Sequence, residues 1–238
     1  MIIDYLIHDV WTLKACSLTC HSWYIAACSR LHRTLVLSDH HGSLQTLSNW
    51  HALGLLPFAR EIRILQPVGD PTWFLPQYFS HRDSRHFFLM NVQSLTIRYL
   101  DVIAFLPRLQ QSLGHLSPTL RSLTLFSPRC TPLQLAHFIS LFPNLDDIAI
   151  RNFTPATDVL DGTLTPFSTP KLRGKLVLTS SDLVGTWEHL AASCGLRFCF
   201  IHVWGVEECL PVLLDACAKT LETLRIEPFP DQGMGPHC

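Results

Sequence analysis

The sequence predicts an α/β fold in which a short helical head is followed by an αβ solenoid with a parallel sheet on its concave side. Three observations support this fold class. A short apolar pattern recurs at nearly regular intervals, each copy alternates apolar and polar residues as a half-buried strand does, and stretches with helical spacing lie between the copies. Hydrophobic residues make up 47% of the 238 residues and charged residues 16%, so the chain has enough apolar surface to bury a core.

The recurring pattern is an apolar residue followed by two more at offsets of three and five residues. Clear copies are Val92-Leu95-Ile97, Leu120-Leu123-Leu125, Leu145-Ile148-Ile150, Leu196-Cys199-Ile201 and Leu221-Leu224-Ile226; Leu172-Leu176-Leu178 has one extra residue, and Leu35-Leu37 and Ala59-Ile62-Ile64 are weaker. The middle positions 95, 123, 148, 176, 199 and 224 are 23 to 28 residues apart. This is the spacing of leucine-rich repeats.

The stretches between the predicted strands have the spacing of amphipathic helices. Their apolar residues cover 102–109, 135–142, 183–190 and 209–217. Thr131 followed by Pro132 predicts a helix N-cap with proline at the first helical position. Because each strand–helix unit buries its apolar face only against its neighbours, we expect the units to stack into a curved solenoid. An ordinary doubly wound sheet is the alternative, since it shares the alternation of strand and helix.

Several segments depart from the regular repeat. The long interval from Ile62 to Leu95 predicts an insertion near 66–83, and the Pro- and Gly-containing segments 154–170 and 227–238 predict loops. No capping repeat follows the last copy. We therefore expect either a truncated chain or an exposed sheet edge at that end.

The composition predicts a cytoplasmic or nuclear protein. The N-terminal "MIIDYLIHDVW" is acidic where a secretory signal is basic, and no run of eighteen apolar residues could span a membrane. In that compartment the nine cysteines are expected to be free thiols. The net charge is −1 with Lys and Arg dispersed, so neither nucleic acid nor a membrane is an expected partner.

The stretch "LKACSLTCHSW", residues 13–23, concentrates residue types that can carry chemistry. A single Cys-x3-Cys pair does not make a zinc site, so no metal is predicted. On one helix, Cys16 and Cys20 would share an apolar face and His21 would point away from Cys20, which predicts packed cysteines and a solvated histidine. The chain lacks the glycine loops, nucleophile elbows and zinc-protease motifs of common enzymes, so no catalytic residue, cofactor or enzyme activity is predicted.

The same stretch resembles the second half of an F-box. The residues that fall on the F-box positions are Leu13, Cys16, Leu18, Thr19, Cys20 and Trp23. "IIDYLI" before them is similar to the first F-box helix, and "SRLHRTLVL" after them resembles the exit into a first strand, as in large fungal F-box families. The opening Leu-Pro-x-Glu element is absent, so we expect this F-box to be truncated at its N-terminus.

The resemblance implies a helical head at 1–37, a degenerate leucine-rich-repeat domain at 38–229 and a flexible tail at 230–238. Such a protein is the substrate receptor of an SCF-type cullin-RING ubiquitin ligase: the F-box docks on a Skp-type adaptor, and the repeats hold an unknown protein target. The six F-box positions would pack the head and offer the adaptor an apolar face, with Trp23 as anchor. Two alternatives remain: core packing of Trp23 without adaptor contact, and a repeat scaffold with a non-functional F-box.

Side chains that alternate with the buried leucines face the concave side of the predicted sheet. Arginine and aromatic residues are enriched among such positions in binding hot spots. A target-binding patch is therefore predicted at Arg98, Phe126, Arg151, Phe200, His202 and Arg225. The alternative is that these are ordinary exposed positions, because surface arginines are common.

Overall fold

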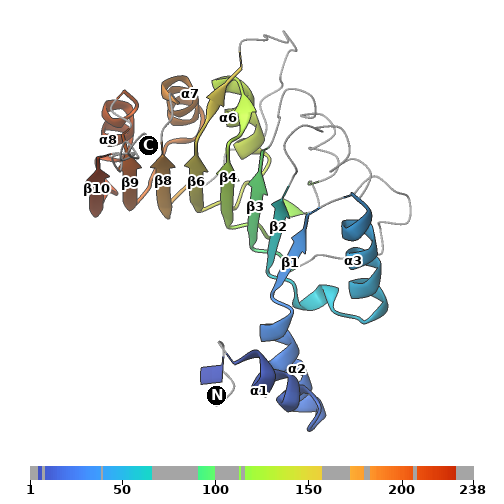
Figure 1. Cartoon of the computed structure of the whole chain (residues 1–238). Helices are drawn as coiled ribbons and strands as arrows, with labels where there is room; N and C mark the ends of the chain where they lie inside the picture. Colours follow the sequence, from blue (N-terminus) through green and yellow to red (C-terminus); the bar gives the residue numbers. More distant parts are fainter. Residues whose placement is uncertain are drawn as a thin grey trace, which may run out of the picture.

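The computed structural model describes residues 5–6, 9–38, 40–65, 91–99, 113, 116–156, 172–179, 183–205 and 208–228. It shows an α/β chain in which a parallel sheet of eight strands follows a pair of N-terminal helices (Figure 1). The predicted insertion near 66–83, the predicted helix at 102–109 and the tail at 230–238 lie outside the described residues. No helix in the described ranges is long and apolar enough to cross a membrane.

The strands of the sheet follow one another in chain order, and each pairs in parallel with its neighbours. They are β1 Thr34–Leu37, β2 Glu61–Leu65, β3 Ser94–Arg98, β4 Ser122–Phe126, β6 Asp147–Arg151, β8 Lys175–Thr179, β9 Phe200–Trp204 and β10 Thr223–Glu227. Each predicted copy of the apolar pattern contributes to one of these strands. The order never reverses within this sheet, so it lacks the switch point of a doubly wound sheet.

A second, two-stranded parallel sheet was not predicted. It pairs β5 Arg129–Cys130 with β7 Thr154–Pro155. The start of the segment predicted as a loop at 154–170 is therefore a short strand. Its pairing partner is only two residues long, which gives no alternation for a sequence pattern to reveal.

In-register pairing aligns two rows of apolar side chains on one face of the main sheet. The first row is Leu35, Ile62, Leu95, Leu123, Ile148, Leu176, Ile201 and Leu224, and the second is Leu37, Ile64, Ile97, Leu125, Ile150, Leu178, Val203 and Ile226. All are buried except Leu224 and Ile226 on the last strand, which are 40% and 58% exposed. The two rows are the floor of the hydrophobic core.

Helices cover this apolar face (Figure 1). They are α3 His40–Ala52, the 3-10 helix η2 Leu56–Phe58, α6 Pro132–Ser140, α7 Val184–Cys194 and α8 Leu210–Cys217. Helix α6 begins at the predicted cap: the Thr131 hydroxyl accepts from the Gln134 N–H, and the Gln134 side-chain oxygen accepts from the Thr131 N–H. Phe138 of α6 and Trp187 of α7 are fully buried against the sheet, so these helices close the core.

The backbone repeats its geometry from strand to strand. A carbonyl just before one strand accepts hydrogen bonds from two successive N–H groups at the start of the next, at Arg33, Arg60, Gln93, Arg121, Gly174 and Cys199. Where β8 begins, Gly174 donates to the Asp146 carbonyl and Lys175 donates to the Asp147 carboxylate. A Cβ at Gly174 would collide with that carboxylate, so the close approach requires glycine.

One predicted copy has a different register. The sequence pattern placed Cys199 at the middle apolar position and Ile201 at the third. In the sheet, Ile201 pairs with Leu176 and Leu224 and is therefore the middle residue of its copy. Alternation has a period of two, so a shift by two residues leaves the pattern unchanged. Cys199 instead supplies the carbonyl that precedes the paired strand.

The N-terminal helices α1 Val10–Ser17 and α2 His21–Leu31 pack on each other next to β1 (Figure 1). Their buried core consists of Leu13, Cys16 and Ala27. The His32 and Trp50 rings, 5.6 Å apart edge to face, connect the end of α2 to α3. Because that core is so small, the pair depends on contacts beyond its own interior.

The expectation that residues 13–23 lie on one helix is wrong. Helix α1 ends at Ser17 with Leu18 as its C-cap, and α2 begins after Cys20. Cys16 is buried and Cys20 is exposed, so the two cysteines do not share a packed face. Short helices joined by a three-residue turn keep the same apolar spacing as one helix over this distance, which is why periodicity did not separate them.

Replacing Leu123 with Ala should lower the free energy of unfolding by about 2 to 5 kcal/mol, because a fully buried side chain in mid-sheet leaves a cavity. Leu224→Ala is the matched control, since Leu224 occupies the same row on the exposed last strand and should cost about 1 kcal/mol or less. Urea unfolding followed by circular dichroism measures both. Equal losses would contradict the position of the core.

Candidate functional site

The helix pair presents many large apolar side chains to solvent. This exposed apolar set consists of Tyr5, Val10, Trp11, Leu18, Trp23, Tyr24 and Ile25. Scattered apolar side chains are normal on protein surfaces, but a concentration on two short helices is typical of an interaction site. The helix pair is therefore the first candidate binding surface.

The six predicted adaptor positions divide into an interior and a surface group. Leu13 and Cys16 are buried between α1 and α2, so they hold the helices together. Leu18, Thr19, Cys20 and Trp23 are exposed. Trp23 is 42% exposed and lies outside the buried core of the pair, so its ring is available to a partner.

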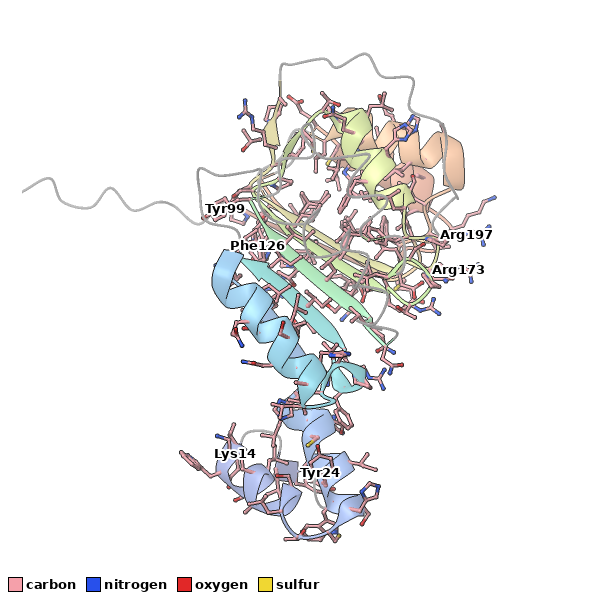
Figure 2. All side chains as sticks on the ribbon, turned by 90° about the vertical axis from the view of Figure 1, so that its right-hand side faces the viewer. Lys14, Tyr24, Tyr99, Phe126, Arg173 and Arg197 are labelled. Atoms are coloured by element: carbon pink, nitrogen blue, oxygen red, sulfur yellow. The ribbon has the colours of Figure 1, made fainter. Side chains whose placement is uncertain are left out.

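Sequence reasoning missed Trp11, which is 80% exposed. Leu18, itself 87% exposed, follows Trp11 by seven residues and is the C-cap of α1. The Nζ of Lys14, labelled in Figure 2, lies 5.0 Å from the centroid of the Trp11 ring. The seven-residue spacing of Trp11 and Leu18 is the signal that could have found this residue.

Cys20 is the exposed thiol of the helix pair. Its Sγ lies 3.3 Å from the Ser22 hydroxyl, and this hydrogen bond lowers the pKa of the Cys20 thiol. Burial instead raises the pKa of the Cys217 thiol in α8. In the described ranges no group of three His, Cys, Asp or Glu residues could hold a metal ion.

The second candidate surface is the face of the main sheet opposite the apolar rows. We call it the open face, because in the described part of the chain no helix packs on it. All six predicted target-binding residues lie on it, since they alternate with the buried rows. They form two groups separated by β8: Arg98, Phe126 and Arg151 on β3, β4 and β6, and Phe200, His202 and Arg225 on β9 and β10.

The first group, which we call the arginine clamp, is Arg98, Phe126 and Arg151. These residues are neighbours in register on three adjacent strands. The guanidinium carbon of Arg98 lies 5.1 Å from the Phe126 ring centroid and that of Arg151 lies 5.2 Å from it, both within cation–π range. Among the described residues neither arginine pairs with a carboxylate, and the Arg151 Nε is buried without a hydrogen-bond partner.

The second group extends into a β9 cluster of Phe200, His202, Trp204, Arg225 and Glu227. The ring centroids of Phe200 and His202 are 6.3 Å apart, and those of His202 and Trp204 are 3.9 Å apart. Trp204 and Arg225 both donate to the Glu227 carboxylate, and the Trp204 hydrogen bond is the main cause that lowers the pKa of Glu227. Arg225 in this cluster therefore has a carboxylate partner, whereas among the described residues Arg98 and Arg151 have none, and the His202 Nε2 is buried without a hydrogen-bond partner.

Trp204 and Glu227 were not among the predicted site residues. Trp204 follows His202 by two residues on the same strand, and Glu227 lies beside it in register on β10. The period-two alternation that placed His202 on the open face could have placed Trp204 there too. Predicting the cross-strand hydrogen bond between Trp204 and Glu227 also required the correct register of β9, and the sequence pattern had placed that register two residues too early.

A shallow cleft of about 500 Å³ lies at the other ends of the strands. Its lining residues are Arg173, Arg197, Cys199, Lys219, Thr220, Leu221 and Glu222. Figure 2 shows Arg173 and Arg197 at one end of the strands and Tyr99 and Phe126 at the opposite end. Arg173 and Arg197 therefore offer a control pair of arginines that lies at the opposite ends of the strands from Phe126.

The two candidate surfaces, on the helix pair and on the open face, consist of apolar, aromatic and cationic side chains. No protein-family model, curated protein or solved structure matches the chain significantly. The residues of both surfaces are suited to noncovalent binding, because aromatic and arginine side chains supply most of the energy in protein interfaces.

Iodoacetamide should modify Cys20 at least about tenfold faster than Cys217 at pH 7.5, because the thiolate is the nucleophile and Cys20 is both exposed and lower in pKa. Its rate should also rise at a lower pH than that of an ordinary thiol. Ser22→Ala removes the stabilising hydroxyl and should move this rise to higher pH. Timed quenching followed by peptide mass spectrometry measures the rates, and preferential labelling of Cys217 would contradict the assignment.

Proposed function

We propose that the protein is the substrate-recognition subunit of an SCF-type cullin-RING ubiquitin ligase. In this proposal the helix pair belongs to an F-box that docks on a Skp-type adaptor, and the open face of the sheet holds a target protein. The observation that carries the proposal is the exposed apolar set on a helix pair whose own buried core is small.

The energetics of the helix pair favour a partner. Burying a leucine-sized side chain that is exposed to water gains about 1.5 to 3 kcal/mol. Leu18 and Trp11 leave most of their surface in water, while the buried cluster between the two helices consists of just Leu13, Cys16 and Ala27. An adaptor that covered these side chains would bind the helix pair and stabilise it through the same contacts, as expected of an F-box.

We also propose that the sheet and its helices are a leucine-rich-repeat-like solenoid. Support comes from the unreversed strand order, the in-register apolar rows and the carbonyl arrangement that recurs before the strands. In a solenoid each unit buries its apolar face against the next, and the strands line the concave side. The arginine clamp and the β9 cluster would then occupy that concave surface.

In this proposal the chain contributes proximity rather than chemistry. Holding a lysine-bearing target beside the ubiquitin-conjugating enzyme makes the transfer effectively intramolecular. The proposal requires a cytoplasmic or nuclear location. A repeat scaffold whose F-box is non-functional would keep the same open face, so the two candidates differ in one property: association of the helix pair with a Skp-type adaptor.

The chain should co-purify with a co-expressed Skp-type adaptor, and titration calorimetry should give a dissociation constant in the micromolar range or tighter. Leu18→Glu should weaken this binding about tenfold or more, because it places a charge in the buried centre of the interface. Leu53→Glu is the matched control: Leu53 is 65% exposed in the turn after α3, outside the exposed apolar set, and its substitution should change the affinity less than about twofold.

Absence of any association between the wild-type chain and the adaptor at micromolar concentrations would remove the ligase role and leave the scaffold. Equal losses in the Leu18→Glu and Leu53→Glu variants would show that the helix pair is not the docking surface. Circular dichroism of both variants confirms that the chain remains folded.

A further inference from the structure

We propose that the arginine clamp binds an acidic polypeptide segment, with one carboxylate on each guanidinium and the chain of the ligand crossing the strands above Phe126. This inference rests on the proposed function in one respect: it names the chemistry of the target that the open face would hold. It follows from the contacts of Arg98, Phe126 and Arg151.

The clamp leaves hydrogen-bond donors available. A guanidinium that stacks over an aromatic ring uses its flat face for that contact, while its N–H groups remain in the plane and point outward. The guanidinium carbons of Arg98 and Arg151 both lie within cation–π range of the same ring, one from each neighbouring strand. The Arg151 Nε is buried without an acceptor, and a bound carboxylate would supply one.

The surroundings of the clamp do not neutralise its charge. In register, the side chains next to it are Leu65 on β2 and Thr179 on β8. The acidic side chains of the described open face are engaged elsewhere: Glu61 pairs with Arg63 at 2.7 Å, Asp147 accepts the Lys175 N–H, and Glu227 pairs with Arg225. In the described part of the chain, both guanidinium charges therefore remain for a ligand.

The spacing of the two cations fits an extended acidic peptide. Both guanidinium carbons lie within 5.2 Å of one ring centroid, so they are at most about 10 Å apart. A polyproline II segment has three residues per turn and rises 3.1 Å per residue, so every third side chain lies on the same side, about 9 Å from the last. Glutamates at that spacing would reach both guanidiniums, and an intervening proline would contact the edge of the Phe126 ring.

Two cations flanked by neutral side chains favour a peptide over a nucleic acid. A phosphate backbone carries a charge at each nucleotide and is bound by several cations along its length. Beside the clamp, β8 presents Val177 and Thr179, which offer no positive charge. A segment with two carboxylates matches this surface more closely.

The test measures binding of the fluorescein-labelled peptide (Glu-Pro-Pro)4 to the full chain by fluorescence anisotropy. The neutral peptide (Gln-Pro-Pro)4 and a labelled oligothymidylate are titrated in parallel. Arg98→Gln with Arg151→Gln should weaken binding of the acidic peptide about tenfold or more, and Phe126→Leu should weaken it about threefold by removing the ring that orients both cations.

The matched control is Arg173→Gln with Arg197→Gln, which removes the same charge at the opposite ends of the strands (Figure 2) and should change the affinity less than about twofold. Binding that depends on Arg98 and Arg151 and not on this control pair supports the proposal. Absence of binding by the wild-type chain, equal losses in the two double variants, or tighter oligothymidylate binding lost in the clamp variant would each overturn it.

The Leu18→Glu variant separates this inference from the ligase role. It should retain the peptide affinity of the wild-type chain, because Leu18 lies on the helix pair. A wild-type chain that binds the peptide but no adaptor would refute the ligase role alone, whereas one that binds the adaptor but no peptide would refute the clamp assignment alone.

Discussion

Every strand of the main sheet directs two apolar side chains to the same face. A single short strand cannot shield these side chains from water by itself. On every strand of the main sheet before β10 they are buried, because parallel pairing in register sets Leu95 beside Leu123 and Ile97 beside Leu125, and because helices such as α6 cover the rows. Register is therefore the constraint on which the rest depends. A slip of one residue on any strand would turn its two apolar residues to solvent and break both rows at that point. The repeated carbonyl before each strand acts against such a slip, because it fixes where the next strand starts.

The same register builds the open face. When the apolar residues of β3, β4 and β6 align, the residues at the ends of these strands must also align, and this brings Arg98 and Arg151 to the two sides of Phe126. The packing of the core thus holds the arginine clamp in place, and among the described residues no carboxylate pairs with Arg98 or Arg151. The β9 cluster shows the other outcome of the same geometry. There β10 supplies Glu227, and its carboxylate already accepts from Trp204 and Arg225.

Alternation and spacing were enough to predict the strands of the main sheet, the helices α6, α7 and α8, and the Thr131 cap, because those features depend on neighbours close in sequence. They also placed Arg98, Phe126 and Arg151 at equivalent positions. They could not fix the register of β9, since a two-residue shift preserves alternation, and they did not separate α1 from α2, since the turn at 18–20 keeps helical spacing. The exposure of Trp11 and the division of the six predicted adaptor positions between interior and surface depend on how two helices pack, which a single periodic pattern does not specify.

The last strand, β10, differs from the other strands of the main sheet in the exposure of its apolar residues. On β10 the apolar residues Leu224 and Ile226 are partly in water, whereas their counterparts on every earlier strand are covered. Among the strands of the main sheet, β10 buries the least of its apolar residues, so we expect local opening of the sheet to start there. The β9 cluster lies next to the strand that we expect to open first. The arginine clamp lies four strands inward, where we expect the backbone to stay ordered longest. We therefore expect the backbone of the open face to be most mobile at β10 and most rigid at β4.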